Sequence, residues 1–487
     1  MPDDLPPALS AAQRRGLAEL LRVAPVVGEL GERFTAAGHE IYLVGGSVRD
    51  ALLGRLGPDL DFTTDAEPPV ILELVRGWAE ATWEVGIAFG TVGLTKHAHT
   101  LEVTTFRADA YDPASRKPTV RFGSRLEEDL LRRDFTVNAM ALPIPLGAGL
   151  IDPFGGIRDL LAGRLRTPGA PEDSFGDDPL RMLRAARFRA QLGFEVDPAV
   201  TAAASAMAER LGIVSAERIR DELSKLMQAA NPRLGLTFLV ETGLAERILP
   251  ELPKLRLEID EHHHHKDVYE HTLTVLEQVI GREPSGPDLT LRLAALLHDI
   301  GKPKTRSLEP GGRVSFHHHE VVGAAMARGR LTALRYPKEL VEDVARLVEL
   351  HLRFHGYSSG EWTDAAVRRY VRDAGPMLDR LHALVRSDCT TRNRRKAAAL
   401  AATYDTLEAR IAELGAREEL ARLRPDLDGQ QVMDILGIPP GPLVGEALAA
   451  LLELRIQHGP LGREAAIRAL LEWAEARGIP PTGTTSD

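Results

Sequence analysis

The chain has 487 residues, a formal net charge of −10 and a single cysteine, Cys389. This length allows about three domains, and 44% hydrophobic with 27% charged residues is typical of a globular protein. One cysteine excludes a disulfide framework and a cysteine-rich zinc site, no apolar run reaches the ~18 residues of a membrane span, and the acidic, proline-rich first ten residues are unlike a secretory signal.

These exclusions favour a cytoplasmic protein with no membrane partner. Because the net charge is negative, any binding to RNA has to come from a local basic surface. No feature of the sequence predicts an oligomeric state.

Helical and strand-like patterns predict an α+β protein. Residues 8–37 have the periodicity of a leading helix. From residue 41 to about 145, strand-like runs (IYLVGG, DLDFTT, FGTVGLTK and LEVTTFR) alternate with helical ones such as VILELVRGWAE. We therefore expect a small mixed α/β domain over residues 1–160, followed by mostly helical domains over residues 161–255, 256–400 and 401–487.

The stretch from Ile41 to Phe62 carries the first candidate site. An apolar strand leads into Gly45-Gly46, and Ser47 with Asp50 three residues later predicts a helix that begins in a capping box. Glycines and a proline then end that helix. A glycine turn at a helix start offers unpaired N–H groups to a phosphate, although such a turn is as often purely structural.

Two carboxylates follow on a second predicted strand. Asp59 and Asp61 are two residues apart, so their side chains project from the same face. Neighbouring carboxylates repel each other unless a cation lies between them, and Mg²⁺ is the oxygen-preferring ion that suits them. A lone Asp-x-Asp is more often a solvated strand end, but the turn and the carboxylates together indicate nucleotide chemistry.

In this order and spacing, residues 41–62 resemble the opening motif of the nucleotidyltransferases of the DNA polymerase beta superfamily. The resemblance is closest to the class II branch, which holds CCA-adding enzymes and bacterial poly(A) polymerases. It implies that Asp59 and Asp61 are catalytic and hold Mg²⁺. It also implies that the nucleotide is bound by Gly45, Gly46, Ser47 and Arg49.

Glu102, in LEVTTFR, is a third candidate carboxylate. On residue type alone, an exposed strand glutamate is an equally good interpretation. Family members carry a glutamate in a similar strand beside the metal pair, so the resemblance implies a catalytic Glu102. The turn-rich segment 107–128 then reads as a mobile loop. In the family, a loop at this place helps switch the site from C to A addition, and its presence here favours complete CCA addition.

The next segment, DLLRRDFTVNAMALPI, concentrates hydrogen-bond donors. Guanidinium groups suit a bidentate grip on triphosphate oxygens, and Asp134 is placed to accept from a ribose hydroxyl. An isolated RRD is usually a solvated charge cluster. Here it matches the family's second motif, RRDFTxNA. The nucleotide-binding residues implied by this match are Arg132, Arg133, Asp134 and Asn138.

Residues 177–194, DDPLRMLRAARFRAQLGF, predict a helix with a proline in its first turn and Asp177 or Asp178 as its cap. Asp178 and Arg181 are three residues apart and would share a helix face. Taken alone, the segment reads more simply as an exposed, salt-bridged helix. The same stripe continues with Arg184 and Arg187.

A carboxylate only accepts hydrogen bonds and a guanidinium only donates them. Cytosine and adenine both present an amine beside a ring-nitrogen acceptor, whereas uracil and guanine present a carbonyl and an N–H. An Asp–Arg pair therefore matches C and A, and each mismatch with U or G costs about 1–3 kcal/mol. The family's EDxLR motif, its amino-acid template, falls on Asp178 and Arg181, with Asp177 in place of the usual Glu. AERIRDELSKLM, residues 216–227, matches the family's fifth motif and is expected to brace the helical neck.

Histidines concentrate in the next part of the chain. Eleven of the sixteen lie between His262 and His355, and HDIGK follows the apolar run LRLAALL. Dispersed His and Asp residues that end separate helices can converge on divalent ions. The ordered set resembles an HD phosphohydrolase domain, which implies a transition metal or Mg²⁺ as cofactor. The implied first-metal ligands are His271, His298, Asp299 and Asp388, and a second metal would add His319 and His351.

The C-terminal region completes the resemblance. The basic cluster TTRNRRKAA (390–398) would contact RNA backbone or be a solvated helix start, and the turn IPPGPLVG (438–445) precedes a helix that could hold a phosphate. The final residues, 480–487, are expected to be disordered. We therefore predict a nucleotidyltransferase head, neck, HD domain and tRNA-holding tail.

The resulting hypothesis is a CCA tRNA nucleotidyltransferase with an added phosphohydrolase activity, whose partners are tRNA, CTP and ATP. Two alternatives stay open: a poly(A) polymerase that uses ATP alone, and an RNA-end phosphohydrolase that works through the HD site.

Overall fold

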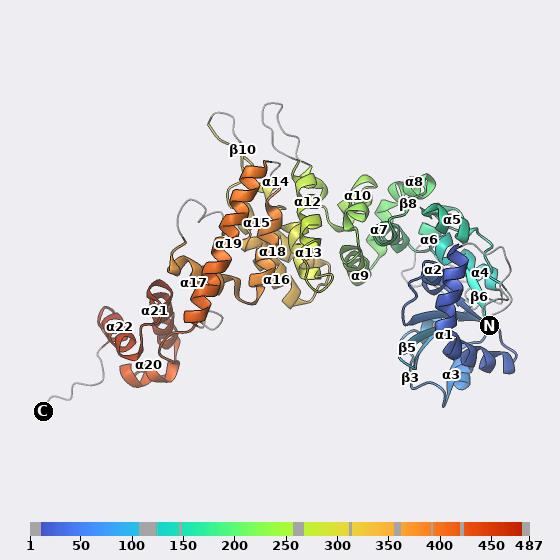
Figure 1. Cartoon of the computed structure of the whole chain (residues 1–487), viewed down its shortest axis with the longest axis horizontal. Helices are drawn as coiled ribbons and strands as arrows, with labels where there is room; N and C mark the ends of the chain where they lie inside the picture. Colours follow the sequence, from blue (N-terminus) through green and yellow to red (C-terminus); the bar gives the residue numbers. More distant parts are fainter. Residues whose placement is uncertain are drawn as a thin grey trace. The chain divides into compact units, whose positions relative to one another are not determined.

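The computed structural model describes residues 11–106, 123, 125–145, 149–256, 267–310, 314–354, 362–390, 393–418 and 423–479 (Figure 1). The chain divides into two units, Met1–Pro253 and Lys254–Asp487, which are treated separately below. In the described ranges, no helix is both long enough and apolar enough to cross a membrane. Most of the loop predicted at 107–128 lies outside these ranges, and its last three residues instead begin helix α4 (Leu126–Leu131). The His262–His265 run and the predicted disordered end at 480–487 also lie outside these ranges.

A six-stranded sheet forms the centre of the first unit, in the order β3-β4-β5-β2-β1-β6. Strands β2 and β5 pair in parallel, and every other neighbouring pair is antiparallel. The mixed α/β head is thus confirmed, with β3 as a strand that the sequence pattern did not predict. The strands are β1 (Ile41–Val44), β2 (Asp59–Thr64), β3 (Ala81–Trp83), β4 (Thr91–Lys96), β5 (His99–Thr105) and β6 (Ala141–Pro143).

Helices pack on this sheet as the apolar periodicity predicts. The leading helix α1 (Ala11–Ala36) contacts α2, α3 and β1, and it buries Val27, Leu30 and Phe34 completely. The other helical elements of the head are α2 (Gly45–Leu52), α3 (Pro68–Val75), η1 (Ile87–Phe89), α4 (Leu126–Leu131), η2 (Thr136–Asn138) and α5 (Gly156–Ala162).

The capping box predicted at Ser47 is wrong. Helix α2 begins at Gly45, two residues earlier, and Ser47 lies inside it. Its hydroxyl instead accepts from the backbone N–H of Asp61 at 2.9 Å and lies 3.4 Å from the carbonyl of Asp59, to which it donates. Asp50 pairs with Arg49 rather than with the helix start. Ser47 therefore links α2 to the strand that carries the carboxylate pair.

Helices dominate the rest of the first unit, where α7 packs against both α9 and α10. The predicted cap of α7 needs correction, because Asp177 ends the preceding helix and Asp178 has an extended backbone between the two helices. Asp178 still accepts from the N–H of Leu180 at 3.1 Å. The elements are β7 (Arg164–Leu165), α6 (Pro171–Asp177), α7 (Leu180–Leu192), β8 (Glu195–Val196), α8 (Pro198–Ala206), η3 (Ala208–Ile213), α9 (Ala216–Met227), α10 (Pro232–Glu241) and α11 (Ala245–Ile248).

The second unit begins with a helical core in which α12 packs on α13 and α18, and α16 packs on α13 and α15. A two-stranded antiparallel pair, β9 (Ser307–Leu308) with β10 (Val314–Ser315), lies between α14 and α15 in the sequence. The helices are α12 (Val268–Ile280), α13 (Leu289–Leu297), α14 (Lys302–Thr305), α15 (His319–Ala333), α16 (Lys338–Leu350), α17 (Asp364–Ala374), α18 (Leu378–Asp388) and α19 (Arg394–Arg417). A mostly helical remainder is confirmed.

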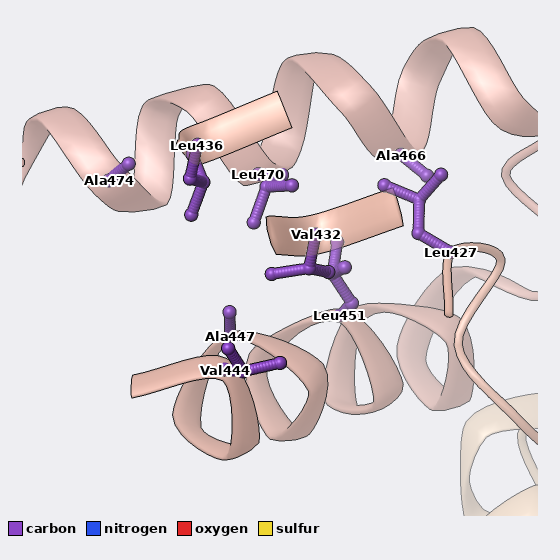
Figure 2. Close-up of a cluster of buried hydrophobic side chains, with 9 residues drawn as sticks. All are labelled: Leu427, Val432, Leu436, Val444, Ala447, Leu451, Ala466, Leu470 and Ala474. Carbon is purple, nitrogen blue, oxygen red and sulfur yellow. The ribbon is translucent and has the colours of Figure 1, made fainter. Parts of the chain in front are cut away.

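The last three helices share an apolar core of their own. Figure 2 shows nine buried side chains gathered between α20 (Gly429–Leu436), α21 (Pro442–His458) and α22 (Arg463–Glu475). Helix α20 starts in a capping box, in which Asp428 and Gln431 each accept from the other's backbone N–H. The core residues are Leu427, Val432, Leu436, Val444, Ala447, Leu451, Ala466, Leu470 and Ala474.

We predict that Leu451→Ala destabilises this three-helix region by about 3 kcal/mol, because it removes a buried side chain from the middle of the core. Hydrogen exchange of the α20–α22 amides in the full chain measures the loss of protection. Glu446→Ala, an exposed change on the same helix, is the control and should change the protection little. Unchanged protection in Leu451→Ala would contradict the packing described above.

Candidate active site

The start of α2 lies against an arginine. Gly45 has a φ of +68°, and a Cβ at this position would come within 2.9 Å of the Arg133 guanidinium. Only glycine meets both conditions without strain. Arg133 donates to Asp129 at 3.1 Å, while its Nε is buried with no hydrogen-bond partner among the described residues. This turn therefore brings the Arg133 guanidinium, which is already paired with Asp129, against the helix start.

The three predicted catalytic carboxylates lie on two neighbouring strands. Asp59 and Asp61 alternate with the buried Leu60 on β2, and Asp61 is in direct register with Glu102 on β5. Burial raises the pKa of Asp61; Arg133 lowers it, but Glu102 and Asp59 raise it further. Such mutual repulsion marks a place where a cation is stabilising. Their oxygen chemistry fits Mg²⁺.

A cavity of about 380 Å³ opens beside Asp61. Six arginines and three aspartates line it, so its wall carries an excess of positive charge that suits an anion. Twelve of the predicted residues line it, together with Phe188: Gly45, Gly46, Arg49, Asp61, Arg132, Arg133, Asp134, Asn138, Asp178, Arg181, Arg184 and Arg187. Ser47, Asp59 and Glu102 lie outside its lining.

A buried chain of hydrogen bonds shapes one wall of this cavity. Arg49 donates to the Asn138 side-chain oxygen at 2.6 Å, and the Asn138 amide donates to Asp134 at 2.9 Å. Arg184 donates to the other oxygen of Asp134 at 2.7 Å. Burial opposes the charge on Asp134, but Arg184 and Asn138 hold the pKa of its carboxyl well below the ordinary range. Asp134 is therefore an ionised acceptor that organises two arginines.

The predicted base-reading pair lies at the start of α7. Arg181 donates to the carbonyl and hydroxyl oxygens of Ser174, at 3.1 and 3.0 Å, and to the carbonyl of Arg132. Asp178 accepts from Arg218 of α9 at 2.7 Å as well as from Leu180. The side chains of Asp178 and Arg181 are thus both fixed by hydrogen bonds to other groups of the protein.

Phe188 is a cavity residue that was not among the predicted nucleotide-binding residues. The guanidinium carbons of Arg187, Arg49 and Arg184 lie 4.0, 5.1 and 5.7 Å from its ring centroid. Its edge packs against Phe135 with a centroid distance of 5.8 Å. Cations over an aromatic face are attracted by its quadrupole. The spacing i, i+4 from Arg184 is the only sequence signal for this arrangement.

In the second unit, the six predicted metal ligands converge from separate helix ends. They form two groups, one of His271, His298 and Asp388 and one of Asp299, His319 and His351, each with ligand atoms within 4.8 Å of one another. Asp299 belongs to the second group but also lies next to the first. Its Oδ2 is 3.3 Å from His298 Nε2, and its Oδ1 is 3.2 Å from His319 Nε2.

The histidines present one nitrogen each to this centre. Nδ1 of His298, His319 and His351 donates to a backbone carbonyl at 2.8, 2.8 and 2.6 Å, while each buried Nε2 makes no hydrogen bond of acceptable geometry to the described residues. Burial, together with His298, lowers the pKa of His351 to about 4, which keeps it in the neutral, ligating form. Oriented, unpartnered nitrogens beside two carboxylates fit divalent metal ions.

The sheet with its carboxylates and the arginine-lined cavity define a nucleotidyltransferase. Three family models match the chain: the poly A polymerase head domain over residues 41–166, the probable RNA and SrmB-binding site of polymerase A over 193–255, and the HD domain over 268–414.

Among known proteins, the chain is 36% identical to the A-adding tRNA nucleotidyltransferase of Deinococcus radiodurans, with 89% of this chain and 95% of that protein covered. It is 33% identical to the CC-adding tRNA nucleotidyltransferase of Thermus thermophilus, with 91% and 96% covered. The crystal structure of the Bacillus stearothermophilus CCA-adding enzyme in complex with CTP matches with a TM-score of 0.66 and 26% identity over 96% of this chain and 99% of that one. The chain belongs to the tRNA nucleotidyltransferase family, and the resemblance stated above is confirmed.

We predict that Phe188→Leu weakens binding of tripolyphosphate about tenfold. Three guanidinium groups lose their contact with the aromatic ring, while residue 188 remains an apolar side chain. Calorimetric titration measures the affinity. Phe175→Leu changes a fully buried aromatic residue that does not line the cavity, so it should lower stability but not affinity. Equal effects of the two substitutions would argue against a role for the Phe188 ring.

For the second unit, we predict that Asp299→Asn removes both metal ions, whereas His298→Ala removes the ion held with His271 and Asp388. Metal content is measured by mass spectrometry after loading with Co²⁺ and desalting. His317→Ala removes an exposed neighbouring histidine and should leave the content unchanged. Retention of two ions by Asp299→Asn would contradict a carboxylate shared between the groups.

Proposed function

We propose that this chain adds C, C and A from CTP and ATP to the 3′ end of tRNA without a nucleic-acid template. The observation that carries the proposal is that Asp178 and Arg181 line the same cavity as Asp61 and the phosphate-gripping arginines. One cavity thus combines a base selector complementary to C and A with a triphosphate grip. The likeness to a CCA-adding enzyme in complex with CTP supports the same substrate class.

In this mechanism, the tRNA 3′-oxygen forms a bond to the α-phosphorus while the bond from that phosphorus to the bridging oxygen breaks, releasing pyrophosphate. Arg49, Arg133, Arg184 and Arg187 bind the triphosphate oxygens and hold the α-phosphate in line. Asp134, organised by Asn138 and Arg184, accepts from the ribose hydroxyl.

Asp59, Asp61 and Glu102 would hold Mg²⁺ at the reacting end of the cavity. When bound, the ion supplies activation of the attacking hydroxyl and charge stabilisation of the leaving group. The residues that read and grip the nucleotide are different from these three carboxylates, so base choice and chemistry use separate side chains. The reaction needs tRNA, CTP and ATP, and we propose that it takes place in the cytoplasm.

Two narrower activities compete with complete CCA addition. Two relatives matched over nearly their full length are an A-adding and a CC-adding enzyme, whereas the CCA-adding enzyme of Latilactobacillus sakei matches at 43% identity over 45% of this chain. The predicted loop at 107–128 favours complete addition.

A second function is proposed for the HD centre. Its unpartnered, buried histidine nitrogens and shared carboxylate support metal-dependent hydrolysis of phosphate esters at RNA ends. The intact carboxylates of the head make this an added activity rather than a replacement for nucleotide addition.

One assay separates these activities. Transcripts of tRNA lacking CCA, ending in CC, or complete are incubated with CTP, ATP or both in Mg²⁺, and the products are resolved to one nucleotide. We expect two C with CTP alone and completion to CCA with both. Addition of A only to the CC transcript would identify an A-adding enzyme, a stop at CC with both nucleotides a CC-adding one, and long A tails a poly(A) polymerase.

Asp59→Asn tests whether the two units work independently. Because Asp59 lies on β2 and the HD ligands lie in the other unit, the variant should lose nucleotide addition by at least a thousandfold and retain hydrolysis of bis(p-nitrophenyl) phosphate with Co²⁺. Loss of both activities would contradict two separate centres.

A further inference from the structure

The base-reading carboxylate lies at a position where the helix alone cannot orient it. Asp178 precedes α7, with φ −142° and ψ 102°, and its side chain is 20% exposed. A reader that accepts from one base and refuses another must keep its oxygen atoms in a fixed direction, because a rotated carboxylate finds other partners. The Asp178 side chain therefore needs a hydrogen-bond partner from outside α7 to fix its direction.

That support comes from α9. Arg218 donates to Asp178 Oδ2 at 2.7 Å, while Oδ1 accepts from the Leu180 N–H at 3.1 Å. Each carboxylate oxygen has two lone pairs, so both retain capacity for a base. Arg218 does not line the cavity, whereas Asp178 does. Arg218 therefore contacts the Asp178 carboxylate from outside the cavity and does not occupy the position of the base.

Helix α9 is itself fixed to α7 by a second ion pair. Glu222 accepts from Arg187 at 2.7 Å, and these side chains are only 5% and 11% exposed. Arg218 and Glu222 are four residues apart and so lie on one face of α9. One face of α9 consequently holds the base reader through Arg218 and one arginine of the triphosphate grip through Glu222.

We propose that Arg218 is a positioning residue for base selection: it fixes the Asp178 carboxylate so that C and A are accepted and U and G are refused. The inference rests on the proposed function. It assigns to α9 a part in choosing the base, in addition to bracing the neck.

The test compares binding of CTP, ATP, UTP and GTP to the full chain by calorimetry, and their incorporation into the tRNA transcripts. Arg218→Ala is expected to reduce the preference for C and A over U and G about tenfold, with the affinity for tripolyphosphate unchanged. Arg218→Lys, which keeps a positively charged hydrogen-bond donor group, should restore part of the preference.

Two controls separate positioning from general loss of structure. Leu226→Ala truncates a buried side chain of α9 that lies against Gly235 of α10, at a cost of about 3 kcal/mol, and it removes no hydrogen bond to Arg218 or Asp178. Arg220→Ala removes the next arginine of α9, which pairs with Asp221. Both should keep wild-type base preference.

The inference is overturned if Arg218→Ala keeps the wild-type preference, if Leu226→Ala loses it equally, or if the wild-type chain binds the four nucleotides alike. Because binding is measured without tRNA, failure of the wild-type chain to extend tRNA would refute the proposed function while leaving the result for Arg218 readable.

Discussion

The first unit depends on one buried carboxylate, that of Asp134. It is 6% exposed, and it joins Arg184 of α7 to Asn138 of η2, which in turn accepts from Arg49 of α2. These residues come from three separate helical elements. Removing Arg184 would leave the buried Asp134 charge with less compensation, which is destabilising. This wall of the cavity is therefore one hydrogen-bonded network, and Arg49 and Arg184 are held in place before any anion binds.

Much of this site could be predicted from short-range patterns. Alternation on β2 places Asp59 and Asp61 on one face, and helical spacing places Arg184 and Arg187 on one stripe. The predictions failed where tertiary contacts override local preference. Ser47 has the chemistry of a helix cap, but a bond to the backbone of Asp61 uses its hydroxyl. Phe188 has the chemistry of a core residue, and only the approach of Arg49, far away in the chain, reveals its position at the cavity.

The HD centre shows how local geometry can prepare a site that only the fold completes. His298, His319 and His351 each use Nδ1 to donate to the carbonyl three residues earlier, so the backbone orients each ring. Each Nε2 therefore points away from its own helix backbone, and no contact with another element is needed to orient the ring. The packing of α13, α15 and α16 then needs only to bring the three rings together. The resemblance implies two metal sets and assigns Asp299 to the first, whereas packing groups Asp299 with His319 and His351.

Fixed side chains matter for selection because the energies are small. A mismatched base costs about 1–3 kcal/mol, and fixing a long polar side chain costs up to about 2 kcal/mol of rotamer entropy. A freely rotating reader would lose much of its discrimination to this ordering or to alternative partners. In this chain, Arg181 is bonded to Ser174 and to the Arg132 backbone, and Asp178 is bonded to Arg218. The rotamer entropy of these side chains is already lost when the chain folds. The hydrogen bonds to the base therefore contribute directly to the difference in binding free energy between nucleotides.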